Sequence, residues 1–104
     1  MFGHCVYFTL KDKSESAVNG LIDDCHKYLA PIPGIVFYAA GPMADEMHRP
    51  VNDRDFDVAL HVVFTDKAAA DAYQVHDEHN AFIEKRSDNW EKVRVFDAHV
   101  AGVE

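Results

Sequence analysis

Two hydrophobic periods alternate along this chain, and their order restricts the folds that it can form. Four stretches are typical of β-strands, because their apolar residues recur at every second position or, in the second stretch, fill every position. These stretches are residues 2–10, 35–40, 56–64 and 90–100. Helical periodicity follows the first stretch over residues 14–29, and the third over residues 65–73 and, more briefly, 79–85. The sequence therefore predicts the order strand, helix, strand, strand, helix, strand.

Residues that end one element and begin the next support this division. Ser14 or Ser16 provides a side-chain oxygen to cap the first helix. The segment Pro31-Ile32-Pro33-Gly34 ends that helix, because proline lacks the donor that a helix needs. Gly41-Pro42 is expected to break the second strand. The polar, aperiodic residues 43–55 that follow are expected to form a mobile loop.

The βαββαβ order is that of ferredoxin-like α+β folds. It predicts a four-stranded antiparallel sheet with two helices on one face. At 104 residues, the chain is expected to form one domain over residues 1–104.

The sheet is predicted to be apolar on the face that the helices leave open as well. Residues 35–40 are apolar at every position, and residues 93–100 place apolar side chains on both faces of the last strand. A sheet that is apolar on both faces needs cover on both. We therefore expect a homodimer in which two sheets pack face to face as an α/β barrel. The alternative is that these residues only reflect the composition of strands.

Composition argues against several classes of partner. The net charge of −8 disfavours nucleic acid and an anionic membrane surface. No apolar run approaches the roughly 20 residues of a membrane helix, and residues 1–4 show no secretory pattern. Cys5 and Cys25 are expected to be reduced and buried, which favours a cytoplasmic location.

Histidine is abundant, with seven residues in the chain. Histidine both donates and accepts protons near neutral pH. A pocket between sheet and helices could bring together His4, His26, Tyr73 and His79. In the functional interpretation His79 is a general base, Tyr73 orients it or stabilises an oxyanion, and His4 and His26 bind the ligand. The alternative is that all four are hydrogen-bonding core residues.

Metal and cofactor sites are not expected. His76 and His79 have a spacing compatible with one helical face, but no second cluster completes a set of four zinc ligands. Glycine-rich phosphate loops and nucleophile elbows are also absent from the sequence.

Several motifs, in order, resemble those of the stress-responsive dimeric α/β barrel (Dabb) family. They are His4-Cys5-Val6-Tyr7-Phe8, Ile32-Pro33-Gly34-Ile35, Phe56-Asp57, Phe64-Thr65-Asp66-Lys67, Tyr73-Gln74-Val75-His76-Asp77-Glu78-His79 and Phe96-Asp97. Asp77 replaces the proline that is usual in the family, and Thr9-Leu10 replaces its basic residue. The resemblance implies the ferredoxin-like dimer. It also points to a plant polyketide cyclase of the family, which uses a histidine and a tyrosine in its pocket.

Three functions follow as hypotheses. The first is a homodimeric stress-response protein that binds a small hydrophobic or aromatic ligand. The second is a cofactor-independent cyclase or isomerase that uses His79 and Tyr73, and the third is a monooxygenase of the antibiotic-biosynthesis type. A core closed by Phe8, Phe37, Phe64 and Phe82 favours binding without turnover, whereas a cavity lined by His4, Tyr73 and His79 favours an enzyme.

Overall fold

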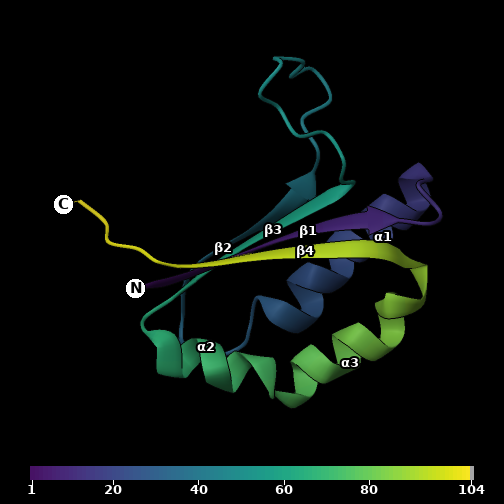
Figure 1. Ribbon diagram of the computed structural model, residues 1–104. Coiled ribbons are helices and arrows are strands. Elements are labelled where there is room, and N and C mark those ends of the chain that lie inside the picture. The colour runs from purple at the N-terminus through teal and green to yellow at the C-terminus, as the bar shows by residue number, and fades with distance from the viewer. Residues whose placement is uncertain (104) are drawn as a thin grey trace.

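Four antiparallel strands form one sheet in the spatial order β2-β3-β1-β4. The computed structural model describes residues 1–103 (Figure 1). Its elements are β1 (Phe2–Leu10), α1 (Glu15–Asp24), a π-helical turn (Cys25–Leu29), β2 (Ile35–Pro42), β3 (Val58–Phe64), α2 (Lys67–Gln74), α3 (Asp77–Arg86), a 3-10 turn (Ser87–Asn89) and β4 (Trp90–His99). This confirms the predicted ferredoxin-like fold. None of the helices in the described part of the chain has the length and apolarity to cross a bilayer.

Each helix begins at a residue that caps it. The Ser14 hydroxyl accepts a hydrogen bond from the Ala17 amide at 3.2 Å, as the sequence predicts. The Asp66 carboxylate accepts from the Ala69 amide at 2.8 Å. At the start of α3 the His76 ring nitrogen Nδ1 accepts from the Glu78 amide at 3.1 Å. This last cap separates α2 from α3, the two helical stretches that the sequence predicts over residues 65–73 and 79–85.

Two predicted strand limits are wrong. Gly41 and Pro42 do not break β2 but end it, and they pair with Ala59 and Val58 of β3. Proline is tolerated here because β2 is an edge strand with a free side. Phe56 lies outside β3, which begins at Val58.

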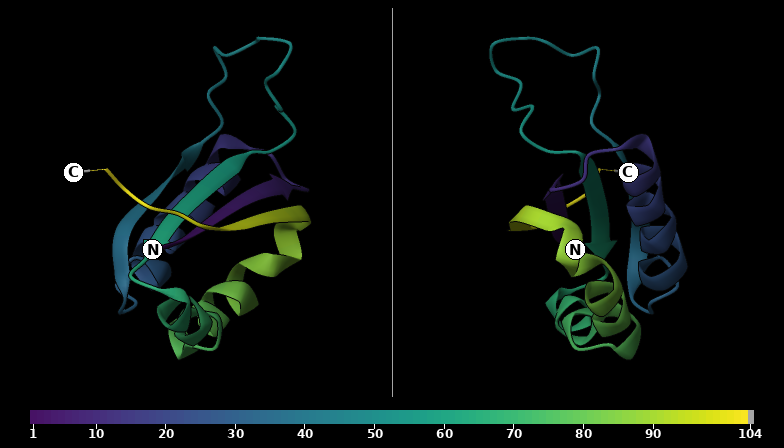
Figure 2. Two further views of the ribbon diagram at one scale, coloured as in Figure 1. Left: turned by 60° about the vertical axis from the view of Figure 1, so that its left-hand side comes forward. Right: turned by 90° about the vertical axis from the view of Figure 1, so that its right-hand side faces the viewer.

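The helices cover one face of the sheet and bury the hydrophobic core. Figure 2 shows α1, α2 and α3 gathered on the same side of the strands. The largest side chains buried there are Tyr73, Phe64, Leu10, Leu21, Leu29 and Leu60. Asp24 is buried at the end of α1 and is paired with Lys85 and Arg86 of α3, which ties the helices together.

The other face of the sheet, called the open face below, carries no helix. Its side chains come from alternate positions of all four strands: Phe37 and Ala39 of β2, Ala59, His61 and Val63 of β3, Cys5 and Tyr7 of β1, and Arg94, Phe96 and Ala98 of β4. Phe37 and Phe96 are about half exposed, at 54% and 55%. The open face is therefore largely apolar, as the sequence predicts.

Replacing Gly34 with alanine is expected to destabilise the fold by about 2–3 kcal/mol. Gly34 joins the end of the first helical segment to β2 with a φ of +92°, and an added Cβ would lie 2.7 Å from the Ala69 Cβ. Urea unfolding measures the change. Gly41→Ala is the matched control, since its Cβ would meet nothing within 4 Å. Equal stability of the two variants would show that this turn is not strained by a side chain.

Candidate functional site

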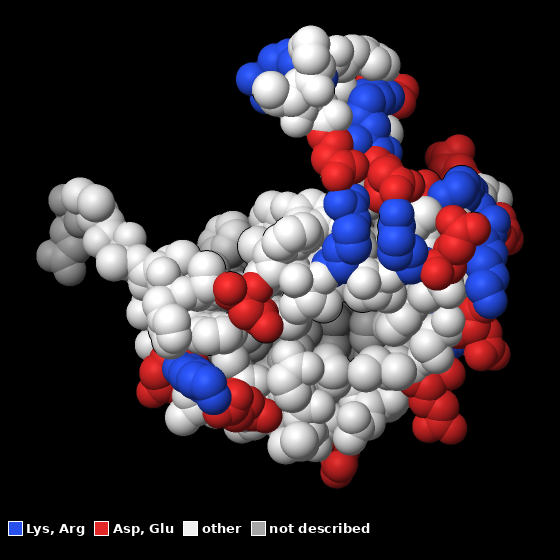
Figure 3. All heavy atoms as spheres, in the orientation of Figure 1, with Lys and Arg blue, Asp and Glu red and all other residues white. Residues whose placement is uncertain are grey.

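A cavity of about 190 Å³ lies between the inner face of the sheet and helices α2 and α3. It exists because α3 does not cover the edge strand β4, where the inward-facing Val93 and Val95 remain exposed. Most of its lining is apolar. The lining residues are His4, Val6, Phe8, Leu29, Leu60, Tyr73, Gln74, His79, Phe82, Ile83, Trp90, Val93 and Val95. Figure 3 shows mostly uncharged surface between β4 and the helices, with one patch of acidic atoms beside it.

The turn between α2 and α3 brings Tyr73 and His79 together at this cavity. Their ring centroids are 4.8 Å apart, although the residues lie on different helices. Their contact therefore depends on the turn that joins the two helices. Tyr73 also packs against Phe64 and His4, with ring centroids 5.0 and 5.8 Å away.

The ring nitrogen Nδ1 of His79 is buried and has no hydrogen-bond partner within residues 1–103. Burial lowers the pKa of His79 below its ordinary value of 6.5, and the neighbouring His4 and His76 lower it further. A backbone hydrogen bond with Gln74 acts in the opposite direction and raises this pKa in part. His79 is thus a neutral imidazole at physiological pH with a free polar atom, which suits it to pair with a ligand or to accept a proton.

Stability is expected to fall as the pH drops below about 6.5, because of His79. Its folded-state pKa is lowered, so the unfolded chain takes up a proton first. His79 therefore makes its full contribution to the free energy of unfolding above its ordinary pKa. This contribution is lost as the pH falls toward the lower pKa that His79 has in the folded chain. Thermal melts from pH 7.5 to 5 should show a shallower fall in Tm for His79→Gln than for the parent. His48→Gln, in an exposed loop, should leave the slope of the parent.

Tyr73 is almost fully buried, at 1% exposure. Burial raises the pKa of its hydroxyl above the ordinary value, and the Cys25 and Tyr38 side chains raise it further. The hydroxyl is therefore protonated at neutral pH and is available as a hydrogen-bond donor.

A buried histidine and a carboxylate are paired at the edge of the same cavity. His4 Nδ1 lies 2.6 Å from Asp97 Oδ1, across the ladder that joins β1 to β4. An ionised carboxylate only accepts hydrogen bonds, so it selects the His4 tautomer that donates from Nδ1. Trp90 adds another polar atom without a partner among the described residues, its indole Nε1.

The structure brings together three of the four residues expected at the site, namely His4, Tyr73 and His79. The expectation that His26 joins them is wrong. Its side chain is exposed, and its Nδ1 lies 2.8 Å from the Tyr38 hydroxyl, away from the cavity. The reason is that His26 falls in the π-helical turn Cys25–Leu29, where Cys25 and Leu29 are buried in its place.

Sequence reasoning missed Asp97 and Trp90 as parts of the site. Asp97 shares the strand periodicity of Val93 and Val95, so a carboxylate in a core-facing pattern was the available signal. Of the four phenylalanines expected to close the core, Phe8, Phe64 and Phe82 are buried, whereas Phe37 lies on the open face. The cavity remains between the three buried rings and β4. Within residues 1–103, no group of three or more His, Cys, Asp or Glu side chains is placed to hold a metal ion.

Comparison with known proteins identifies the class to which this fold and site belong. The family model of the stress responsive A/B barrel domain, Dabb, matches residues 2–100. The chain therefore belongs to the Dabb family. No match was found among curated proteins.

Three solved structures illustrate the similarity. A Dabb family protein with a ferredoxin-like fold from Mesorhizobium loti is 27% identical, with 97% of each chain covered and a TM-score of 0.78. A dimeric ferredoxin-like protein of unknown function from Thermobifida fusca is 20% identical, covering 95% of this chain and 90% of that one, with a TM-score of 0.77. The hydroxynitrile lyase of Passiflora edulis is 18% identical, covering 99% and 95%, with a TM-score of 0.76.

Proposed function

We propose that this protein is a homodimer that binds a small, uncharged, aromatic or hydrophobic molecule in the cavity beneath β4. The observation that carries the proposal is the buried, unpartnered Nδ1 of His79 in a mostly apolar lining. A buried polar atom without a partner costs free energy, which a ligand hydroxyl or carbonyl can recover. Apolar walls with a few polar groups are typical of small-molecule sites.

The cavity limits the size and charge of the ligand. A volume of about 190 Å³ is suited to a single substituted ring rather than to a large polycyclic compound. The Asp97 carboxylate beside His4 and the net charge of −8 both disfavour an anion. The Trp90 indole Nε1, which has no partner among the described residues, is a donor, so the ligand should carry an oxygen acceptor.

The homodimer in this proposal forms through the open face. That face exposes Phe37 and Phe96 with no helix to cover them, and exposed apolar patches of this kind mark interaction sites. A two-fold axis allows the same patch to cover itself. The dimeric state of the Thermobifida fusca protein, which has the same fold, supports this arrangement.

A second candidate is cofactor-independent proton transfer in the same cavity. It is favoured by the opposite protonation of the paired rings, since His79 is held neutral and Tyr73 is held protonated. His79 would accept a proton from carbon next to a carbonyl, and Tyr73 would donate a hydrogen bond to the oxyanion that develops. A hydroxynitrile lyase among the similar structures is compatible with such chemistry on this fold.

Ligand-observed NMR with benzyl alcohol, benzaldehyde and benzoate tests the binding function. The two uncharged compounds are expected to bind and benzoate is not. Val95→Phe places a larger side chain at the mouth of the cavity, where Val95 is half exposed, and should abolish binding without unfolding the chain. Binding that is unchanged in Val95→Phe would place the ligand elsewhere and refute the proposal.

A further inference from the structure

The loop between β2 and β3, residues 43–57, forms an arm that projects from the sheet on the side away from α2 and α3 (Figures 1 and 2). Its own side chains hold its shape. The Arg54 guanidinium donates to the Asp45 carboxylate at 3.1 Å and also to the Asp45 and Met47 carbonyl oxygens. At the tip, the Asn52 amide donates to the Arg49 carbonyl at 2.9 Å. Residues 43–57 thus form the expected loop, and hydrogen bonds join its two limbs.

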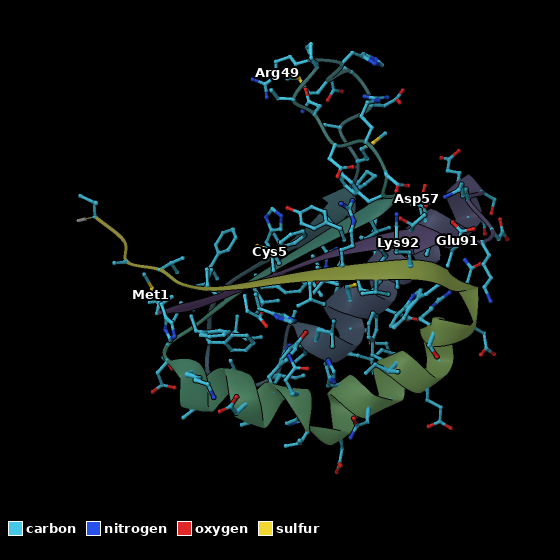
Figure 4. The ribbon with its side chains drawn as sticks, in the orientation of Figure 1. Met1, Cys5, Arg49, Asp57, Glu91 and Lys92 are labelled. Carbon is cyan, nitrogen blue, oxygen red and sulfur yellow. The ribbon has the colours of Figure 1, made fainter. Side chains whose placement is uncertain are left out.

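The foot of the arm is fixed to the open face. Arg94 donates to the Asp53 carboxylate at 2.7 Å and to the Asp55 carbonyl at 3.0 Å, while Lys92 pairs with the Asp55 carboxylate. Figure 4 shows Asp57 and Lys92 at this foot and Arg49 at the far tip, and Figure 3 shows charges of both signs gathered at the foot. The carboxylates of Asp53 and Asp55, on the part of the arm that leads into β3, are therefore paired with basic side chains of β4.

A hollow of about 510 Å³ lies between the arm and the sheet. Its lining comes from the arm (Asn52, Asp53, Phe56), from β1 (Cys5, Tyr7) and from β4 (Arg94, Phe96). Aromatic rings form much of it, since the Tyr7 ring packs against Phe56 and Phe96 with centroids 4.9 and 5.8 Å away. Further out, the arm exposes Met47 and Val51, and Val51 is 82% exposed.

We infer that the arm binds a second copy of this chain, the same copy that packs on the open face. The hollow between the arm and the sheet receives apolar side chains of that second copy. The inference rests on the proposed homodimer and adds a second element to its interface. The arm rises on the side of the sheet that the partner would occupy, and the hollow is continuous with the open face through Cys5, Tyr7 and Phe96. With the charges of residues 53–55 paired within the chain, the arm offers apolar side chains at Met47, Val51 and Phe56. A two-fold axis would place one arm on each side of the dimer.

Sedimentation velocity across a dilution series tests the inference with Val51→Glu. A charge on the tip should weaken the dimer by tenfold or more, because it would be buried against the partner. Val75→Glu is the matched control, since Val75 is also an exposed valine, at 74%, but lies between α2 and α3. It should leave the dimer dissociation constant unchanged. In the parent, hydrogen exchange at residues 47–52 should also slow as the protein concentration rises through that constant.

The possible outcomes distinguish the role of the arm in the interface from the existence of the homodimer. A dimer whose affinity is the same in Val51→Glu and Val75→Glu, with concentration-independent exchange in the arm, would overturn the role of the arm and leave the homodimer standing. A parent chain that is monomeric at micromolar concentration would overturn both. Weakening by Val51→Glu alone, with slowed exchange in the arm, would establish the arm as part of the interface.

Discussion

Replacing Phe96 with glutamate should convert the proposed dimer into monomers. In the isolated chain Phe96 lies on the open face and is 55% exposed, so the fold itself should tolerate a charge there. In a face-to-face dimer the same carboxylate would be buried without a partner, once in each copy. Such burial costs several kcal/mol, so the dissociation constant should rise by about a hundredfold or more.

Sedimentation equilibrium at micromolar concentration measures this change. The parent should have twice the chain mass of 11.7 kDa, and Phe96→Glu should have that mass alone. Val75→Glu carries the same charge on the opposite side of the molecule and should remain dimeric. Retention of the dimer in Phe96→Glu would show that the open face is not the interface.

Replacing His79 with alanine should remove proton transfer in the cavity while the fold is retained. His79 lines the cavity, where its Nδ1 has no partner within the described residues, so its loss breaks no hydrogen bond of that atom. Loss of a general base typically lowers a rate by about 10²–10⁴-fold. Tyr73→Phe should also slow the reaction, because it removes the donor to the developing oxyanion.

Deuterium incorporation into the methyl group of acetophenone, followed by NMR in D₂O, is the measurement. The parent should accelerate this exchange over buffer, and His48→Ala, in the exposed arm, should equal the parent. If His79→Ala also equals the parent, His79 is not the base. If no chain exceeds buffer, the proton-transfer candidate fails and ligand binding alone remains to be tested.

The fold was predictable because its information is local. Strand periodicity and helix caps such as Ser14 depend on residues that are close in sequence. The apolar open face follows because the strands carry apolar residues at both odd and even positions, which point to opposite faces of the sheet. The site was predictable only in part, since it depends on how elements meet. The break between α2 and α3 arises from the His76 cap, and it decides that Tyr73 and His79 meet ring to ring.

The missed residues have similar physical causes. The sequence predicts His26 in the pocket at the end of a regular helix, but the π-helical turn Cys25–Leu29 changes the rotation per residue and exposes it. Asp97 became visible as a partner of His4 only through the register of β1 and β4. The contacts of the arm were likewise hidden in the sequence, because its polar residues bind one another and the open face across long separations in the chain.

The most direct test of the proposed ligand cavity uses the indole group of Trp90. Trp90 is the one tryptophan of the chain, and it lines the cavity with its Nε1 unpartnered among residues 1–103. Titration with benzyl alcohol, followed by the indole ¹H–¹⁵N resonance, should give a saturable shift with one site per chain, and Val95→Phe should abolish it. An indole resonance that does not move up to the solubility limit of the alcohol, or that moves equally in Val95→Phe, would contradict the proposed function.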